Sequence, residues 1–154
     1  MQITKFIAIF ANKTNYKMTE KIDIESLLVQ LREFFKTQRE IRFSFLHGSV
    51  LDEKRIPKDI DIAVMFTDDV EDTLDRCIAL SCKLDKRIRF EKQLSFDVRP
   101  LNEAPLGFKY YAARGKLIFA LNEADTFEFI SLIHRMYWDW KPRVIKYISH
   151  LKVV

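Results

Sequence analysis

Two carboxylates placed two positions apart in a short apolar segment are the residues of this chain best suited to chemistry. Asp59 and Asp61 flank Ile60, and side chains at i and i+2 of a strand point to the same face. At about 4 Å and an effective dielectric constant near 20, two such charges repel by roughly 4 kcal/mol. A fold that keeps them together is best explained by a hard cation held between them.

A small-residue turn and a third carboxylate extend this pattern. Gly48 and Ser49 end an apolar run, and such a turn can bring backbone N–H groups and a hydroxyl close to a phosphate. Asp97 lies between Phe96 and Val98, so it faces the polar side if those two pack inward. Each motif alone has an ordinary structural explanation, a tight turn or solvated edge aspartates. The ordered combination is more specific, because three carboxylates on one sheet face are the minimal apparatus for two Mg²⁺ ions.

The elements that must position these residues follow from the hydrophobic pattern. Asp23 is expected to cap the first helix, and a proline should break or kink the last one at Lys141-Pro142. We expect helices over residues 23–37, 70–86, 105–114 and 123–140, and strands over residues 41–46, 59–66, 94–98 and 116–120.

The same pattern predicts which side chains face the core. The predicted inward-facing sets are Ile41, Phe43 and Phe45 in the first strand, Ile60, Ile62 and Val64 in the second, and Val70, Leu74, Ile78 and Cys82 in the second helix. The only two cysteines, Cys77 and Cys82, are expected to be buried thiols in a reducing compartment. Gly115 is expected to follow the end of the short third helix.

The order of Gly48-Ser49, Asp59-Ile60-Asp61 and a lone Asp97 resembles the DNA polymerase beta superfamily of nucleotidyltransferases. Three further segments, residues 97–105, 110–119 and 135–142, are similar to a narrower branch, the minimal nucleotidyltransferase (MNT) antitoxins of HEPN–MNT toxin–antitoxin pairs. The resemblance covers about residues 23–148. It implies an α/β nucleotidyltransferase fold, with a small mixed sheet and flanking helices.

The resemblance also implies an activity. AMP would pass from ATP to a tyrosine hydroxyl of a HEPN ribonuclease toxin and so neutralise it, in a hetero-oligomer. Asp59 and Asp61 would hold two Mg²⁺ ions, Asp97 would complete the second metal site and help to deprotonate the attacking hydroxyl, and Gly48 and Ser49 would grip the phosphates.

One departure from the family leaves alternatives open. Relatives commonly carry an arginine and a glycine soon after Gly-Ser, whereas this loop reads Val50-Leu51-Asp52-Glu53-Lys54-Arg55. Phosphate contact would then depend on Lys54, Arg55 or Lys58. The alternatives are an antitoxin that acts by binding alone, or transfer to a small-molecule hydroxyl of the aminoglycoside type. His47, Tyr110 and Tyr111 are weaker candidates for nucleotide contact.

Composition favours one globular domain over residues 23–154, preceded by an N-terminal arm over residues 1–22. The chain has 154 residues, 48% of them hydrophobic and 31% charged, and a net charge of +4. From Arg135 to Val154, five basic residues accompany one acidic residue, which suits a solvated helix face or an acidic partner. We expect a cytoplasmic protein with no membrane segment and no direct nucleic-acid role.

Overall fold

One mixed sheet organises the chain in the computed structural model, which describes residues 22–90 and 94–151. Strand β1 (Ile41–His47) pairs antiparallel with both β2 (Asp59–Phe66) and β4 (Lys116–Ala120), and β3 (Ser95–Pro100) runs parallel to β2. The strand order is β3-β2-β1-β4. The predicted arm falls almost wholly on residues 1–21, which lie outside the described residues, so the predicted domain division stays a prediction.

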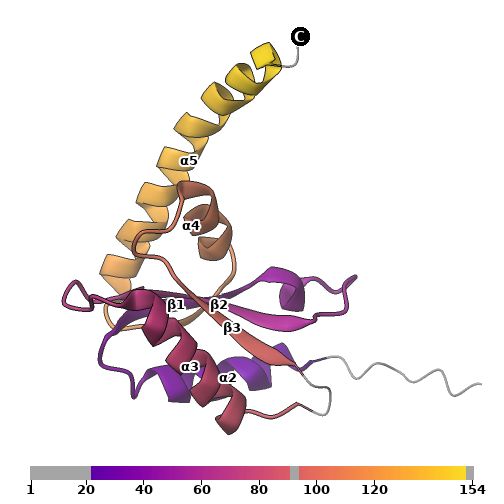
Figure 1. Cartoon of the computed structure of the whole chain (residues 1–154), viewed down its shortest axis with the longest axis vertical. Coiled ribbons are helices and arrows are strands. Elements are labelled where there is room, and N and C mark those ends of the chain that lie inside the picture. The colour runs from indigo at the N-terminus through magenta and orange to yellow at the C-terminus, as the bar shows by residue number, and fades with distance from the viewer. Residues whose placement is uncertain (1–21, 91–93, 152–154) are drawn as a thin grey trace, which may run out of the picture.

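Helices cover the two faces of the sheet unequally. Helices α2 (Ile24–Phe35) and α3 (Thr73–Arg87) lie against one face, while α4 (Leu106–Ala113) and the beginning of α5 (Glu123–Leu151) lie against the other (Figure 1). A 3₁₀ turn, η1 (Gly48–Leu51), follows β1. Among the described residues, α4 and α5 extend over only part of the second face (Figure 1).

Two apolar cores match this arrangement. The larger core lies between the sheet and α2 and α3, and it includes the predicted inward residues Ile60, Ile62 and Val64 of β2. The smaller core lies under α4 and α5 and contains Ala63 and Met65 of the same strand. Alternate residues of β2 thus serve opposite faces, which fixes where the intervening carboxylates point.

The first helix begins as predicted. The Asp23 side chain accepts hydrogen bonds from the backbone N–H groups of Glu25 (3.1 Å) and Ser26 (3.3 Å), and the helix starts at Ile24. An aspartate at this position satisfies N–H groups that have no partner within the helix. The predicted N-cap is confirmed.

The face predicted for the second helix was wrong for three of its four residues; the fourth, Val70, precedes α3 and packs against the larger core. Leu74 and Ile78 are 65% and 58% exposed, and Cys82 is exposed as well. A strict spacing of four advances by about 40° per step around a helix of 3.6 residues per turn, so such a series drifts away from the core. The buried residues Cys77, Leu80 and Leu84 alternate spacings of three and four instead.

Cys77 is the one cysteine that matches the burial prediction. Its side chain is fully buried, and this burial raises the pKa of the thiol to about 12. Cys77 therefore stays protonated and behaves as a small apolar residue.

The first strand also departs from its prediction. Phe43 and Phe45 pack in the smaller core, but Ile41 belongs to the larger one. The pairing of β1 with β2 shifts register between Ile41 and Phe43, which reverses the face of the residues before the shift. Ile41 therefore does not share a face with the two phenylalanines.

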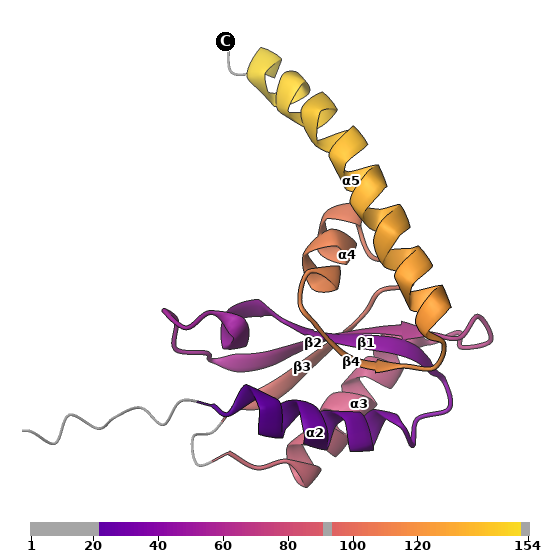
Figure 2. The ribbon, with the colours of Figure 1, turned by 180° about the vertical axis from the view of Figure 1, so that it is seen from behind.

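Helix α5 does not break at Lys141-Pro142, which was the first of the two outcomes predicted there, a break or a kink. It runs without interruption from Glu123 to Leu151 with Pro142 inside it (Figure 2). Proline cannot donate to the carbonyl of the residue four positions earlier, here Trp138, but this part of the helix is exposed and water can replace that donor. No helix among the described residues is both long and apolar enough to cross a membrane.

Gly115 follows the end of α4, as predicted, but for a different reason. Among the described residues only Gly48 has a positive φ, so Gly115 does not adopt a left-handed conformation. A Cβ at Gly115 would instead collide with the backbone carbonyl oxygen of Leu46 in β1. Glycine is required there because two backbones approach closely.

Candidate active site

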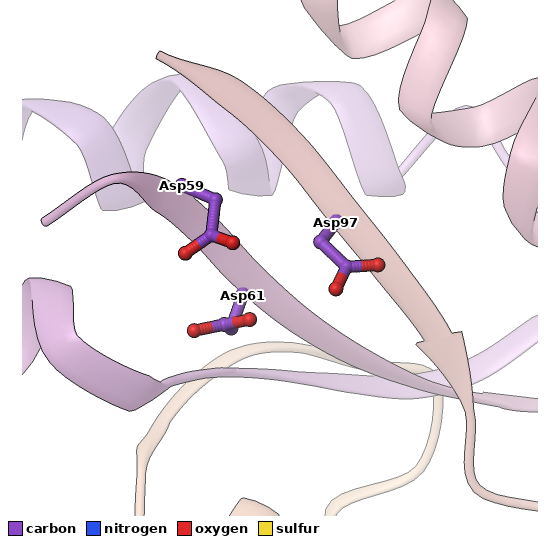
Figure 3. A group of neighbouring side chains, drawn as sticks. All are labelled: Asp59, Asp61 and Asp97. Carbon is purple, nitrogen blue, oxygen red and sulfur yellow. The ribbon is translucent and has the colours of Figure 1, made fainter.

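Three aspartates meet on strands β2 and β3, beside the η1 turn. Asp61 in β2 is directly opposite Asp97 in β3, and Asp59 lies two residues before Asp61. The three side chains point toward one another (Figure 3), and each can offer an oxygen such that all three oxygens lie within 4.8 Å of one another. The sequence predicted this convergence on the condition that the first three strands were neighbours, and the order β3-β2-β1 meets it.

The strands hold this geometry through their buried neighbours. Ile60 and Ile62 are fully buried on the opposite face of β2, and Phe96 and Val98 are buried on that face of β3. A slip of one residue in either strand would drive carboxylates into the apolar core and expose these side chains. The core therefore fixes the register that brings Asp61 and Asp97 together.

Helix α3 anchors the outer strand through two polar side chains. The Ser81 hydroxyl accepts a hydrogen bond from the N–H of Val98 (3.1 Å), and the Asp85 carboxylate accepts one from the N–H of Phe96 (2.9 Å). These N–H groups flank Asp97 on the free edge of the sheet. Sequence reasoning missed both residues, although their spacing of four on one helix face was an available signal.

The carboxylates repel one another in the absence of a cation. Burial raises the pKa of Asp61, and the neighbouring charges of Asp59 and Asp97 raise it further. Each aspartate is still partly open to solvent. Three hard oxygen donors at this separation fit a divalent cation such as Mg²⁺, which favours carboxylates and keeps water or phosphate in its other positions.

An arginine that the sequence analysis overlooked lies beside the triad. Arg99 follows Asp97 by two residues in β3 and donates to one oxygen of that carboxylate from both Nε (2.9 Å) and Nη2 (2.8 Å). Its positive charge also lowers the pKa of Asp61, opposing the two aspartates. Arg99 thus neutralises part of the charge that a bound cation would neutralise.

We therefore expect Arg99→Met to tighten the binding of a divalent cation. An exposed ion pair contributes roughly 0.5–1 kcal/mol, so the gain should be about two- to fivefold in the dissociation constant. Calorimetric titration with Mn²⁺ measures it. Arg55→Met is the matched control, because Arg55 pairs with Asp52 in the loop instead. Equal Mn²⁺ affinity of wild type and Arg99→Met would show that the arginine does not compete with the metal.

The Gly48-Ser49 turn contacts the triad directly. Gly48 has a φ of +80°, and a Cβ at this position would collide with the carboxylate of Asp61. Only glycine combines this backbone conformation with so close an approach. Ser49 follows in η1 and is partly exposed. The turn therefore leaves exposed backbone beside the acidic group, where a phosphate that shares the cation would lie.

His47 precedes this turn and packs edge-to-face on Phe108 of α4, with ring centroids 5.5 Å apart. Burial lowers the pKa of its imidazole, followed by the charge of Arg99. Its buried Nε2 has no hydrogen-bond partner among the described residues. The imidazole of His47 is therefore neutral and has one nitrogen without a partner among the described residues. Its contact with a nucleotide stays a prediction.

The other weak candidates for nucleotide or phosphate contact differ in burial and in their distance from the triad. Tyr110 is buried and stacks on Tyr137, with centroids 3.7 Å apart, whereas Tyr111 is 59% exposed. Lys54 and Arg55 line a cavity of about 450 Å³ that none of the three aspartates lines. Phosphate contact by Lys54, Arg55 or Lys58 stays a prediction, and the cavity, which lies toward α2, is separate from the triad.

Comparisons with known proteins agree with this geometry. The family model described as polymerase beta, nucleotidyltransferase, matches residues 29–124, more than half of the chain. A search of curated protein sequences gave no significant match.

Solved structures share the fold at low sequence identity. A chain of the toxin–antitoxin crystal structure MntA–HepT is 18% identical, with a TM-score of 0.58 over 84% of this chain and 97% of that one. A chain of a toxin–antitoxin structure with AMP-PNP is 18% identical, with a TM-score of 0.59 over 84% of this chain and 98% of that one. A chain of the complex between the tri-AMPylated Shewanella oneidensis HEPN toxin and MNT antitoxin is 17% identical, with a TM-score of 0.58 over 81% of this chain and 98% of that one. The α/β fold, the family match and the acidic triad lead to one conclusion: this chain belongs to the polymerase beta nucleotidyltransferase family.

Proposed function

We propose that this chain is an antitoxin that transfers AMP from ATP to a tyrosine hydroxyl of a HEPN-type ribonuclease and thereby silences it. The observation that carries the proposal is the meeting of Asp59, Asp61 and Asp97 beside the Gly48 turn. Three carboxylates next to exposed backbone suit a nucleoside triphosphate better than a neutral ligand, because divalent metal ions bind both carboxylates and phosphates.

Each residue then has a distinct role in the reaction. Asp59 and Asp61 would hold Mg²⁺, which when bound neutralises phosphate charge and orients the nucleotide. Gly48 and Ser49 would position the β- and γ-phosphates through backbone N–H groups and the hydroxyl. Asp97 would accept the proton of the attacking hydroxyl. The tyrosine oxygen forms a bond to the α-phosphorus, the bond from that phosphorus to pyrophosphate breaks, and pyrophosphate leaves.

Similar solved structures support the choice of acceptor. They include MntA–HepT and HEPN–MNT complexes, one of them with a tri-AMPylated toxin and another a toxin–antitoxin structure with AMP-PNP. The partial exposure of all three aspartates fits a protein acceptor, because a large substrate can approach them. A phosphate and a base added near a ribonuclease site would obstruct RNA by bulk and negative charge.

The proposal predicts a mass change in the partner. Incubation with ATP, Mg²⁺ and the HEPN protein encoded beside this chain should add one or more AMP units to that protein, on a tyrosine. Intact-mass and fragment-ion spectrometry measure this. An unchanged partner that is nevertheless neutralised, by wild type and Asp59→Ala alike, would favour the alternative in which the antitoxin acts by binding alone.

A further inference from the structure

The C-terminal half of α5 carries large apolar side chains that are left largely exposed, although Trp138 and Trp140 contact Tyr137 on the same helix. Beyond Tyr137, no residue from Trp138 to Leu151 is buried. Figures 1 and 2 show this part of the helix extending away from the sheet and the other helices. The exposed apolar residues here are Trp138 (58%), Trp140 (42%), Ile145 (57%), Tyr147 (67%), Ile148 (47%) and Leu151 (60%).

Most of these side chains continue the face by which α5 packs on its own domain. Ile133 and Tyr137 are buried against α4 in the third apolar cluster. Steps of three and four residues from them lead along one side of the helix. We call the continuation the α5 stripe, and it consists of Trp140, Val144, Tyr147, Ile148 and Leu151. The face that folds the protein therefore extends past the end of the domain.

A helix of this kind is not self-sufficient. Isolated segments of about 14 residues are marginally stable in water, and most helix stability in proteins comes from packing of the apolar face. Pro142 weakens the segment further, because it removes one backbone hydrogen bond. An exposed apolar stripe on a helical segment of marginal stability indicates a surface that another protein covers.

Charge distinguishes between the two candidates for that protein. On a helical projection, Lys141 and Arg143 border the α5 stripe on opposite sides, and Lys146 lies on the polar face behind it. A second copy of the chain would bring the same cations together along the seam, which like-charge repulsion disfavours. A groove edged by carboxylates would instead pair with Lys141 and Arg143.

We infer that the α5 stripe is the docking surface for a protein partner that offers an apolar groove bordered by acidic residues. This rests on the proposed function in one respect: the partner is the HEPN-type protein that receives AMP. Docking on α5 uses none of the residues of the triad, so the partner binds to the α5 stripe while its tyrosine reaches the triad. Affinity and transfer are then separable properties of the chain.

Two neighbouring residues give a matched test. Ile148 belongs to the α5 stripe, whereas Ser149 lies on the opposite side of the helix and is exposed. Binding of the full chain to the neighbouring HEPN protein is measured by calorimetry without nucleotide, so no transfer is needed. Ile148→Glu should weaken binding at least 30-fold, and Ser149→Glu should change it less than threefold. Arg143→Glu should weaken binding several-fold and reduce its dependence on salt.

The opposite results would overturn the inference. They are equal affinity of the Ile148→Glu and Ser149→Glu variants, absence of binding by the wild-type chain, or a wild-type dimer in light scattering that Ile148→Glu alone dissociates. In the last case a second copy covers the stripe. Tight binding that Ile148→Glu abolishes, together with no AMP transfer by the wild-type chain, would support the docking surface and refute the proposed function.

Discussion

Asp59→Ala and Asp61→Ala are each expected to lower AMP transfer by on the order of 10³-fold. Each change removes a ligand from the site where a divalent cation would balance phosphate charge, and such a loss costs about 4 kcal/mol of transition-state stabilisation. Asp59 lies opposite Ser95 and Asp61 opposite Asp97, so the two carboxylates hold different positions and neither can take over that of the other.

Single-turnover transfer and calorimetry check this expectation. ATP should bind much more tightly with Mg²⁺ than with EDTA to wild type, and this difference should shrink in both variants. Asp75→Ala is the control, since Asp75 is an exposed carboxylate in the first turn of α3. Equal ATP affinity of the wild type in Mg²⁺ and EDTA would remove the two-metal interpretation.

Stability should change in the opposite direction from activity. Burial first, and then repulsion from Asp59 and Asp97, raises the pKa of Asp61 in the folded protein. A raised carboxyl pKa means that the protonated form favours folding, so ionisation destabilises the protein as the pH rises through that pKa. Asp61→Asn should therefore raise the midpoint of thermal unfolding at neutral pH without metal, and the gain should vanish in acid. A lower midpoint at neutral pH would contradict this sign.

Much of the site was predictable because its motifs depend on local rules. Alternation in a strand places Asp59 and Asp61 on one face without knowledge of the fold. The bounds of β2 and β4 follow their apolar runs and agree with the predicted ranges. Convergence with Asp97 required one further condition, that β2 and β3 be adjacent, and the structure meets it. The fold class was implied by the resemblance of these motifs to nucleotidyltransferases, and the family match confirms it.

The residues that were missed depend on contacts between distant segments. Ser81 and Asp85 are ordinary polar residues of a helix until β3 lies beside them with unpaired N–H groups. Arg99 was missed for a different reason: the predicted strand ended at residue 98, whereas β3 continues to Pro100 and so places Arg99 on the same face as Asp97. Gly115 is explained only by the nearby carbonyl of Leu46. Sequence periodicity shows which residues share a face, but not which distant backbone groups lie beside them.

The errors have a similar origin. A helix partly in solvent tolerates proline because water satisfies the carbonyl left without a donor, so Pro142 does not end α5. A shift of register in β1 cannot be read from the alternation it interrupts, so Ile41 was placed on the wrong face. In both cases the local rule was sound, and the tertiary environment decided the outcome.

Asp97→Asn is expected to separate nucleotide binding from transfer. Asparagine preserves the shape of the side chain and one oxygen, so ATP affinity should stay within several-fold of wild type. It cannot accept the proton of the attacking hydroxyl, and the loss of a general base typically costs 10²–10⁴-fold in rate. Transfer should therefore fall by roughly that factor with a nearly unchanged dissociation constant for ATP.

The same substitution also frees Arg99 from its ion pair, and this effect has to be separated from the loss of the base. Arg99→Met breaks the same ion pair by removing the arginine, and it leaves the carboxylate of Asp97 intact. If Asp97 accepts the proton, Asp97→Asn should lower the rate of transfer far more than Arg99→Met does, because only the second variant keeps the carboxylate. Loss of ATP binding by Asp97→Asn together with full residual transfer would contradict the proposed role. Equal losses of transfer in the two variants would instead assign the effect to the ion pair, because that pair is broken in both.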